Sequence, residues 1–271
     1  MSTNLIKTHF LKELNLNGSY KVGDQNPEIK KIQEWLNLWS IQSPSVYSPV
    51  KVDSLFGKKT DKAIRTFQTS MHLKVDGIAG PITFGALTTP LKKAYTMSPP
   101  LNLTLKEHML YFGTQHVQNT PRELNQNEGP WVRSYMDGLD GKEEKWCMGF
   151  VQTNLDMAAT ALNEKYTDIL KRSVSCIDIF KFANEHDMLI PFDELRKNPN
   201  NVQPGDIFLL YRPQEGAWGH TGIIEKMNPA EGTMNTIEGN SNPTDPGTNG
   251  IGAFKKTRNF LQEKICAVVM P

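Results

Sequence analysis

The chain has 271 residues, which is long enough for two domains of ordinary size. Its 30 basic and 29 acidic residues nearly cancel, so neither nucleic acid nor a membrane is expected as a partner. Three cysteines are too few for a disulfide scaffold, and no apolar run is long enough to span a bilayer. Residues 1–20 lack the apolar stretch and cleavage site of a secretion signal, so we expect synthesis in the cytoplasm without a conventional signal peptide.

The first 90 residues predict a polar lead-in and then a small helical module. Residues 1–21 have few apolar positions, which fit either a short helix or a frayed end. In residues 22–90, Asn26 can cap a helix that begins at Pro27, and a third, short helix is expected after Pro81. Apolar residues at helical spacing mark one face of the first helix and of a second, at Ile29, Ile32, Leu36 and Trp39 and then at Ala63, Ile64, Phe67 and Met71.

A repeat runs through the later part of this module. Residues 52–64 and 75–87 align 23 positions apart, with Val, Asp, Gly, Thr and Ala recurring in register. In each copy a turn leads into a helix, and its glycine can adopt backbone angles that other residues avoid. Asp53, Asp76, Gly57 and Gly80 are therefore each expected to shape turns.

Several short motifs of residues 22–90 occur together in one known type of domain. They are Gly23-Asp24, residues 32–36 (IQEWL), residues 52–57 (VDSLFG), Thr60, Ala63, Phe67-Gln68 and residues 75–81 (VDGIAGP). As a set they resemble the three-helix peptidoglycan-binding domain found beside bacterial wall enzymes, which implies that this module binds peptidoglycan. The chain departs from the compact form between Trp39 and Val50, where the first connection between helices is longer.

Residues 91–104 are expected to be a linker, stiffened toward polyproline II by Pro99-Pro100. Residues 105–271 then form a second domain. Helical periodicity covers 105–118, 147–164 and 176–188, and strand-like segments follow at 206–212, 219–227, 234–239, 252–257 and 265–270. Helices first and strands afterwards predict the α+β class with an antiparallel sheet.

The chemistry of the second domain is expected at Cys147. Apolar or small residues follow Cys147 at helical spacing, namely Val151, Leu155, Ala158 and Leu162. The thiol is therefore expected at the start of the helix face that packs into the protein. The unpaired N–H groups and the dipole of a helix N-terminus favour an anion and lower the pKa of a thiol. Cys147 is thus placed to be a nucleophile.

A thiol nucleophile needs a base, and the base needs a third group to orient it. His220 is the best base, because it lies on a strand between Gly219 and Gly222, which would let a helix end approach closely. On the next strand, Glu238 and Asn240 share a face. Glu238 is favoured as the orienting group, with Asn240 as its helper, although the sequence barely separates the two.

Four blocks of the second domain occur together in one enzyme family. They are residues 145–151 (KWCMGFV), 204–207 (PGDI), 219–223 (GHTGI) and 237–240 (IEGN). These blocks, supported by residues 128–135 and 254–258, resemble CHAP-domain amidases and peptidases, which are papain-like, NlpC-related enzymes that cut peptidoglycan. The resemblance implies Cys147 as nucleophile, His220 as base and Glu238 or Asn240 as third member. Met148 departs from the family, where small residues usually follow the cysteine, and is expected to crowd the oxyanion site.

Other polar and aromatic residues near these blocks have simpler interpretations. Cys176 continues into an ordinary core stripe and Cys266 lies in an apolar strand, so both are expected to be structural. Trp218 could stack on substrate or pack in the protein. Asp137 and Asp140 offer oxygen ligands for calcium, which some CHAP domains hold just before the cysteine. The alternating ligand pattern is absent, so a plain turn, no metal and no cofactor are expected.

The two domains together predict a cell-wall lytic enzyme that binds peptidoglycan and hydrolyses an amide bond in it, as an N-acetylmuramoyl-L-alanine amidase or an endopeptidase. It would act in the periplasm or at the cell wall. It would arrive there by release, as a phage-type endolysin, or by delivery, as an antibacterial effector with an immunity protein or a secretion-apparatus component as partner. Two alternatives stay open: a non-catalytic wall-binding protein with a degenerate CHAP domain, and a thiol peptidase acting on protein substrates.

Overall fold

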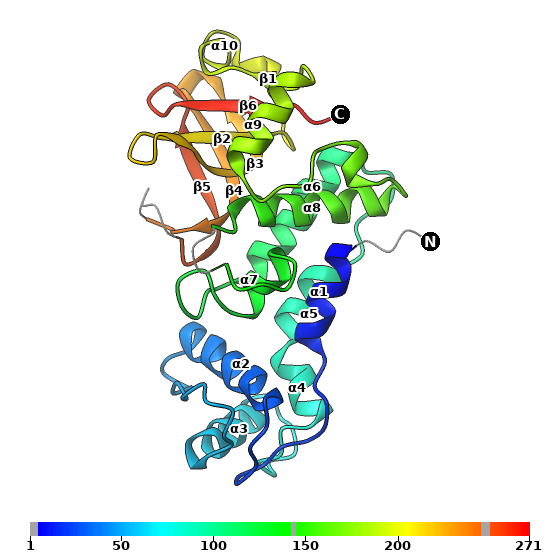
Figure 1. Cartoon of the computed structure of the whole chain (residues 1–271), viewed down its shortest axis with the longest axis vertical. Coiled ribbons are helices and arrows are strands. Elements are labelled where there is room, and N and C mark those ends of the chain that lie inside the picture. Colours follow the sequence, from blue (N-terminus) through cyan, green and yellow to red (C-terminus); the bar gives the residue numbers. More distant parts are fainter. Residues whose placement is uncertain (1–4, 142–144, 245–249) are drawn as a thin grey trace.

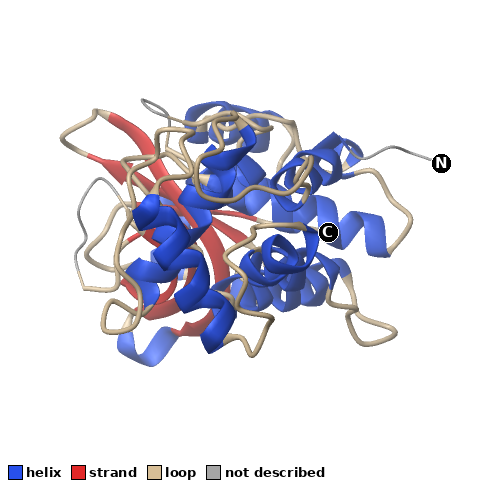
Figure 2. Ribbon diagram, turned by 90° about the horizontal axis from the view of Figure 1, so that it is seen from below, coloured by secondary structure: helices blue, strands red, loops and turns tan. Residues whose placement is uncertain are grey.

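The computed structural model describes residues 5–141, 145–244 and 250–271. The molecule is elongated, with a helical part at one end and an antiparallel sheet at the other (Figure 1). Figure 2 looks from the helical end, so helices lie in front of the strands. Helices followed by a sheet confirm the predicted α+β class. Within the described ranges, no helix is both long enough and apolar enough to cross a membrane.

The N-terminal module contains the three predicted helices. They are α2 (Glu28–Gln42), α3 (Lys58–Ser70) and α4 (Pro81–Leu87), and a further helix, α1 (Leu5–Leu14), precedes them. The side chain of Asn26 accepts a hydrogen bond from the Glu28 N–H at 2.9 Å, so the predicted cap is present although the helix begins one residue later. The lead-in is therefore in part a helix rather than a frayed end.

A buried glutamine organises the first of the repeated turns. Gln33, on α2, is fully buried and donates from Nε2 to Asp53 Oδ1 and to the Leu55 carbonyl, at 2.9 Å each. Its Oε1 accepts from the N–H groups of Asp53 at 2.9 Å and Ser54 at 3.0 Å. The whole amide is thereby satisfied, as a buried polar group requires.

The second turn repeats these contacts one copy later. Gln68, on α3, donates to Asp76 Oδ1 at 3.0 Å and to the Ile78 carbonyl at 3.1 Å, and it accepts from the Gly77 N–H at 3.0 Å. Gly77 has a positive φ of 73°, which glycine adopts without strain. The repeated aspartates thus shape turns, as predicted, and the repeat reflects two copies of one Gln–Asp turn motif.

The connection to the second domain is more structured than the sequence indicated. α5 (Thr89–Thr96) takes up the first residues of the expected linker, and Leu91 and Ala94 are buried. Tyr95 stacks on Phe10 of α1 with ring centroids 4.3 Å apart and donates to the Ser134 carbonyl at 3.0 Å. The connection is therefore packed between both parts of the molecule, while the domain limits at 22–90 and 105–271 stay predictions.

The second domain is built on a six-stranded antiparallel sheet in the order β1-β6-β2-β3-β4-β5. The strands are β1 (Leu189–Ile190), β2 (Ile207–Arg212), β3 (Ala217–Asn228), β4 (Thr233–Ser241), β5 (Gly252–Asn259) and β6 (Ile265–Val268). The five predicted strands are thus present as β2 to β6, and β1 is an addition.

The helices of this domain pack around the sheet. They are α6 (Leu105–Gln118), α7 (Pro130–Tyr135), α8 (Cys147–Ala161), α9 (Cys176–Glu185) and α10 (Phe192–Lys197). Three short 3₁₀ turns complete it, η1 (Tyr166–Asp168), η2 (Pro199–Asn201) and η3 (Pro229–Glu231). α6 approaches the sheet at Gly113, where a Cβ would lie 3.3 Å from Ile223 and 3.4 Å from Ile237. α8 lies against α6 and against β3 and β4, which brings its N-terminus to the sheet.

Candidate active site

Cys147 is the first residue of α8, as the sequence predicted, and it is 2% exposed. Hydrogen bonds from the Cys176 thiol, from His220 and from the Met148 N–H all favour the thiolate. Together they outweigh burial and hold the pKa of Cys147 well below its ordinary value. The sulfur is therefore held as an anion at a helix N-terminus.

His220 lies on β3 and is almost fully buried. Its Nε2 is 2.8 Å from Glu238 Oε2. The other ring nitrogen, Nδ1, is buried and has no hydrogen-bond partner in the described part of the chain, and it is the one that Glu238 leaves available. Burial alone would lower the pKa of His220, but its contacts with Cys147 and Glu238 raise it. The pair is thus disposed as thiolate and imidazolium.

Glu238 is fully buried at the centre of a hydrogen-bond network. Arg258 donates to both carboxylate oxygens, at 2.8 and 2.6 Å, Thr236 donates at 2.7 Å and Ser241 at 3.1 Å. Burial raises the pKa of Glu238, but Arg258 and His220 lower it by a larger amount, so the carboxylate stays charged. Arg258 was not singled out as a site residue from the sequence, although its motif was noted.

The structure brings only one of the two candidate orienting groups to His220. Asn240 has a φ of 48°, donates to Asn127 Oδ1 at 2.6 Å and accepts from the Gly250 N–H at 3.1 Å. None of its hydrogen bonds within the described residues reaches His220. Glu238 is therefore the partner of the imidazole, and Asn240 holds the neighbouring loops together.

The glycines beside the histidine have a different role from the one expected. A Cβ on Gly222 would lie 2.8 Å from Cγ of Glu238, and a Cβ on Gly219 would lie 2.3 Å from a carboxylate oxygen of the preceding turn. The helix approaches instead over Gly239, where a Cβ would lie 2.5 Å from Cβ of Phe150. Gly222 makes room for the carboxylate, and Gly239 makes room for α8.

A cavity of about 290 Å³ opens beside the thiol. It is lined by Lys145, Cys147, Val174, Ser175, Cys176, Glu215, Trp218 and Gly219. Trp218 both lines this cavity and stacks on Phe180, with ring centroids 4.8 Å apart. Met148, which was expected to crowd the oxyanion site, is fully buried and does not line this cavity.

Cys176 was expected to be structural, yet it lies in this cavity beside Cys147. It begins α9 and is preceded by Ser175, whose side chain accepts from the Asp178 N–H at 3.3 Å. The sequence held a signal for this position, because both cysteines begin a helix. What it could not show is that the two helix ends face one cavity.

Trp146, the residue before Cys147, is also fixed by a buried contact. The Trp146 indole donates to Glu123 at 2.5 Å and stacks on Tyr135 with ring centroids 5.2 Å apart. Glu123 also accepts from the Asn127 N–H at 2.9 Å, and burial raises its pKa. The loop that contains Glu123 and Asn127 therefore positions the start of α8.

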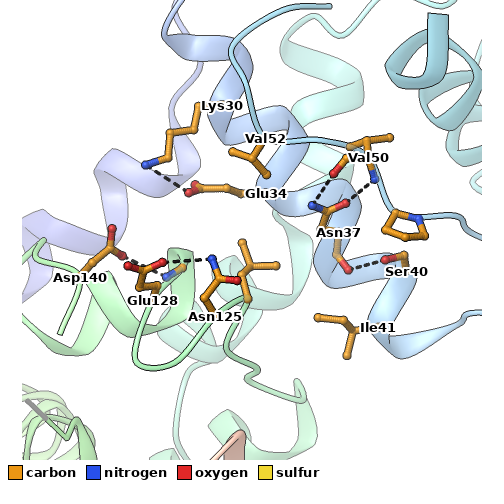
Figure 3. Close-up of a pocket in the computed structure, with 13 residues that line it drawn as sticks. Lys30, Glu34, Asn37, Ser40, Ile41, Val50, Val52, Asn125, Glu128 and Asp140 are labelled. Carbon is orange, nitrogen blue, oxygen red and sulfur yellow. Dashed lines mark hydrogen bonds and ion pairs between the residues drawn. The ribbon is translucent and has the colours of Figure 1, made fainter. Parts of the chain in front are cut away.

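The same loop forms one wall of a second cavity, of about 520 Å³, against the N-terminal module. Figure 3 shows Lys30 and Glu34 of α2 on one side and Asn125, Glu128 and Asp140 on the other. Polar side chains from both parts of the chain thus meet in one groove.

Arg133 of α7 joins the parts of the molecule beside this groove. It is 12% exposed and pairs with Glu13 at 2.8 Å, with Glu34 at 2.6 Å and with Asp140 at 3.1 Å. The three carboxylates come from α1, from α2 and from the loop after α7. One guanidinium therefore holds three separate segments.

The two aspartates considered for calcium contact different arginines. Asp140 pairs with Arg133, and Asp137 pairs with Arg172. Residues 142–144 of the same segment lie outside the described residues. Among the residues that are described, no three His, Cys, Asp or Glu side chains form a group that could hold a metal ion.

The three helices and the duplicated turn define the N-terminal part as a compact helical module. Its residues 25–87 match the family model described as "Putative peptidoglycan binding domain". The chain thus contains a peptidoglycan-binding domain, which supports a role at the cell wall with peptidoglycan as a partner. No curated protein and no solved structure matched the chain.

Proposed function

We propose that this protein is a cysteine-dependent peptidoglycan hydrolase of the CHAP type that cleaves an amide bond. The proposal is carried by the buried row of Cys147, His220, Glu238 and Arg258, whose thiol opens onto a cavity. The peptidoglycan-binding domain in the same chain supports the choice of substrate.

In the proposed reaction the Cys147 thiolate attacks the carbonyl carbon of the amide. The oxyanion that forms would be stabilised by N–H groups at the start of α8. His220 gives a proton from Nδ1 to the leaving amine, and the acyl group stays on the sulfur as a thioester. Water then hydrolyses the thioester, with His220 as the base.

Glu238 and Arg258 have supporting roles in this mechanism. The carboxylate at Nε2 keeps a proton on that nitrogen, so that Nδ1 is the one that exchanges protons with sulfur and substrate. Arg258 keeps the carboxylate charged and fixed in place. No metal or cofactor takes part in the proposed reaction.

Clearance of a purified peptidoglycan suspension tests the proposal. We expect Cys147→Ala to abolish clearance while the thermal unfolding midpoint changes little, and Cys266→Ala, in the sheet, to retain clearance. Undiminished clearance by Cys147→Ala would refute the mechanism. A wild-type protein that pellets with peptidoglycan without clearing it would show a wall-binding protein instead.

Mass spectrometry of the digested peptidoglycan identifies the bond, because each amide leaves different new termini. A cut at N-acetylmuramoyl-L-alanine separates glycan from peptide, whereas an endopeptidase shortens the peptides. We propose that the protein meets this substrate in the periplasm or at the wall after release or delivery. A neighbouring holin gene would favour the endolysin, and a neighbouring gene for a tight inhibitor would favour the effector.

A further inference from the structure

We propose that Cys147 and Cys176 form a reversible disulfide that switches the nucleophile off. Disulfide formation requires only the two thiols and an oxidant, whereas its effect on activity rests on the proposed function. The two parts can therefore be tested separately.

The first observation is the shared location of the two thiols. Cys147 begins α8 and Cys176 begins α9, and both line the same cavity of about 290 Å³. Each of the two thiols also shifts the pKa of the other, as expected for sulfur atoms that lie close together. Cys266, the remaining cysteine, lies on β6 and does not line this cavity.

The second observation is that the two thiols differ in character. The pKa of Cys147 is held low, chiefly by the hydrogen bond from Cys176, whereas that same bond and burial raise the pKa of Cys176. One sulfur is therefore an anion that can attack, and the other is a protonated thiol next to it. Formation of an intramolecular disulfide by thiol–disulfide exchange needs this combination of an attacking thiolate and a second, resolving thiol.

The oxidant is a low-molecular-weight disulfide. The Cys147 thiolate attacks one of its sulfurs, which forms a mixed disulfide and expels one thiolate. The Cys176 sulfur then attacks the Cys147 sulfur, expels the second small thiolate and gives up its own proton. The Cys147 thiolate and the Cys176 thiol together lose two electrons and one proton, and the small disulfide is reduced to one thiolate and one thiol. A small dithiol reverses both steps.

The consequence for the site is direct. In the disulfide, the Cys147 sulfur is no longer a thiolate and cannot attack a carbonyl carbon. The S–S bond joins two residues of the cavity wall. The mixed disulfide is resolved inside the protein, so Cys147 is shielded from irreversible oxidation to sulfinic and sulfonic acids. Reduction restores the thiolate beside His220.

The test uses the full-length protein in buffers with a fixed ratio of oxidised to reduced glutathione. After alkylation and proteolysis, mass spectrometry should find a peptide pair cross-linked between Cys147 and Cys176, and dithiothreitol should remove the link. Clearance of peptidoglycan should be lost and regained with it. Cys266→Ser should behave as wild type.

Cys176→Ser separates the steps, because serine keeps a hydrogen-bond donor but cannot resolve the mixed disulfide. We expect glutathione to remain attached to Cys147 in this variant. A wild-type protein that stays unlinked, or that stops at the mixed disulfide, would overturn the inference while leaving the hydrolase untouched. A protein that forms the link but never clears peptidoglycan when reduced would overturn the proposed hydrolase and leave the disulfide standing.

Discussion

Replacing Glu238 by glutamine would remove one buried negative charge while preserving the shape of the side chain. Arg258, only 5% exposed, would then lose the carboxylate that it contacts at 2.6 Å. Removing one partner of a buried ion pair costs about 3–5 kcal/mol. Glu263 contacts the same guanidinium at 3.1 Å and would offset part of this, so we expect a loss of about 3 kcal/mol.

That loss can be converted into a measurable shift. For a unit of 150–250 residues, 1 kcal/mol corresponds to about 2–4 °C in the unfolding midpoint, so the midpoint should fall by about 6–12 °C. Activity should fall more steeply, because His220 would lose the anion at Nε2 that raises its pKa and fixes its tautomer. A triad whose orienting carboxylate becomes an amide loses up to about 10⁴-fold in kcat.

Two controls separate charge from packing in this experiment. Thr236→Val removes a single hydrogen bond of 2.7 Å to the same carboxylate and should cost about 1 kcal/mol. Adding Arg258→Met to Glu238→Gln removes the uncompensated cation, so stability should recover while clearance does not. Thermal unfolding followed by circular dichroism, together with turbidity of a peptidoglycan suspension, measures both quantities. A Glu238→Gln protein with wild-type midpoint and clearance would refute the reasoning.

Four further substitutions and one pH profile test separate parts of the structure. Gly149→Ala should lower the free energy of unfolding by about 1–3 kcal/mol, since its Cβ would lie 2.6 Å from a backbone carbonyl of α7. Gly85→Ala, with open space around the new Cβ, should stabilise its helix, and equal midpoints would contradict this. Arg133→Met removes the guanidinium from buried Glu13 and Glu34, of which Glu34 keeps Lys30 at 3.6 Å, and should cost about 3–5 kcal/mol, which denaturant titration measures. Because the pKa of Cys147 is lowered, its alkylation should stay fast as the pH falls below about 8.5 and slow only near the lowered value. His220→Ala should move that decline to higher pH, and an unchanged profile would argue against the contact.

Much of the architecture follows from local patterns in the chain. Helical spacing after Cys147 and the run of alternating segments from residue 206 were enough to predict α8 and five strands. The 23-residue repeat was also visible in the chain, although the contact of Gln33 with Asp53 that explains its first turn was not. The predicted helices and strands depend on neighbours in sequence.

Features that depend on the packing of distant segments could not be predicted in this way. Glu238 pairs in register with Phe254 on β5, and only this pairing brings Arg258 to the carboxylate. In the same way, Cys176 had an ordinary core pattern, and only the meeting of α8 and α9 places it beside Cys147. The preference for Glu238 over Asn240 was right about the contact, but no linear pattern could decide it.

The packed junction between the two parts of the chain changes what the wall-binding module can do. Trp35 of α2 meets Trp131 of α7 edge to face at 6.4 Å, and Arg133 binds carboxylates from both sides. A flexible tether would let the cavity beside Cys147 reach every bond within its range. A packed junction instead sets one distance and one orientation between the module and this cavity. For the proposed hydrolase, the position at which the module binds the polymer would then determine which bonds reach Cys147. Only bonds in register with the repeat of the bound polymer would do so.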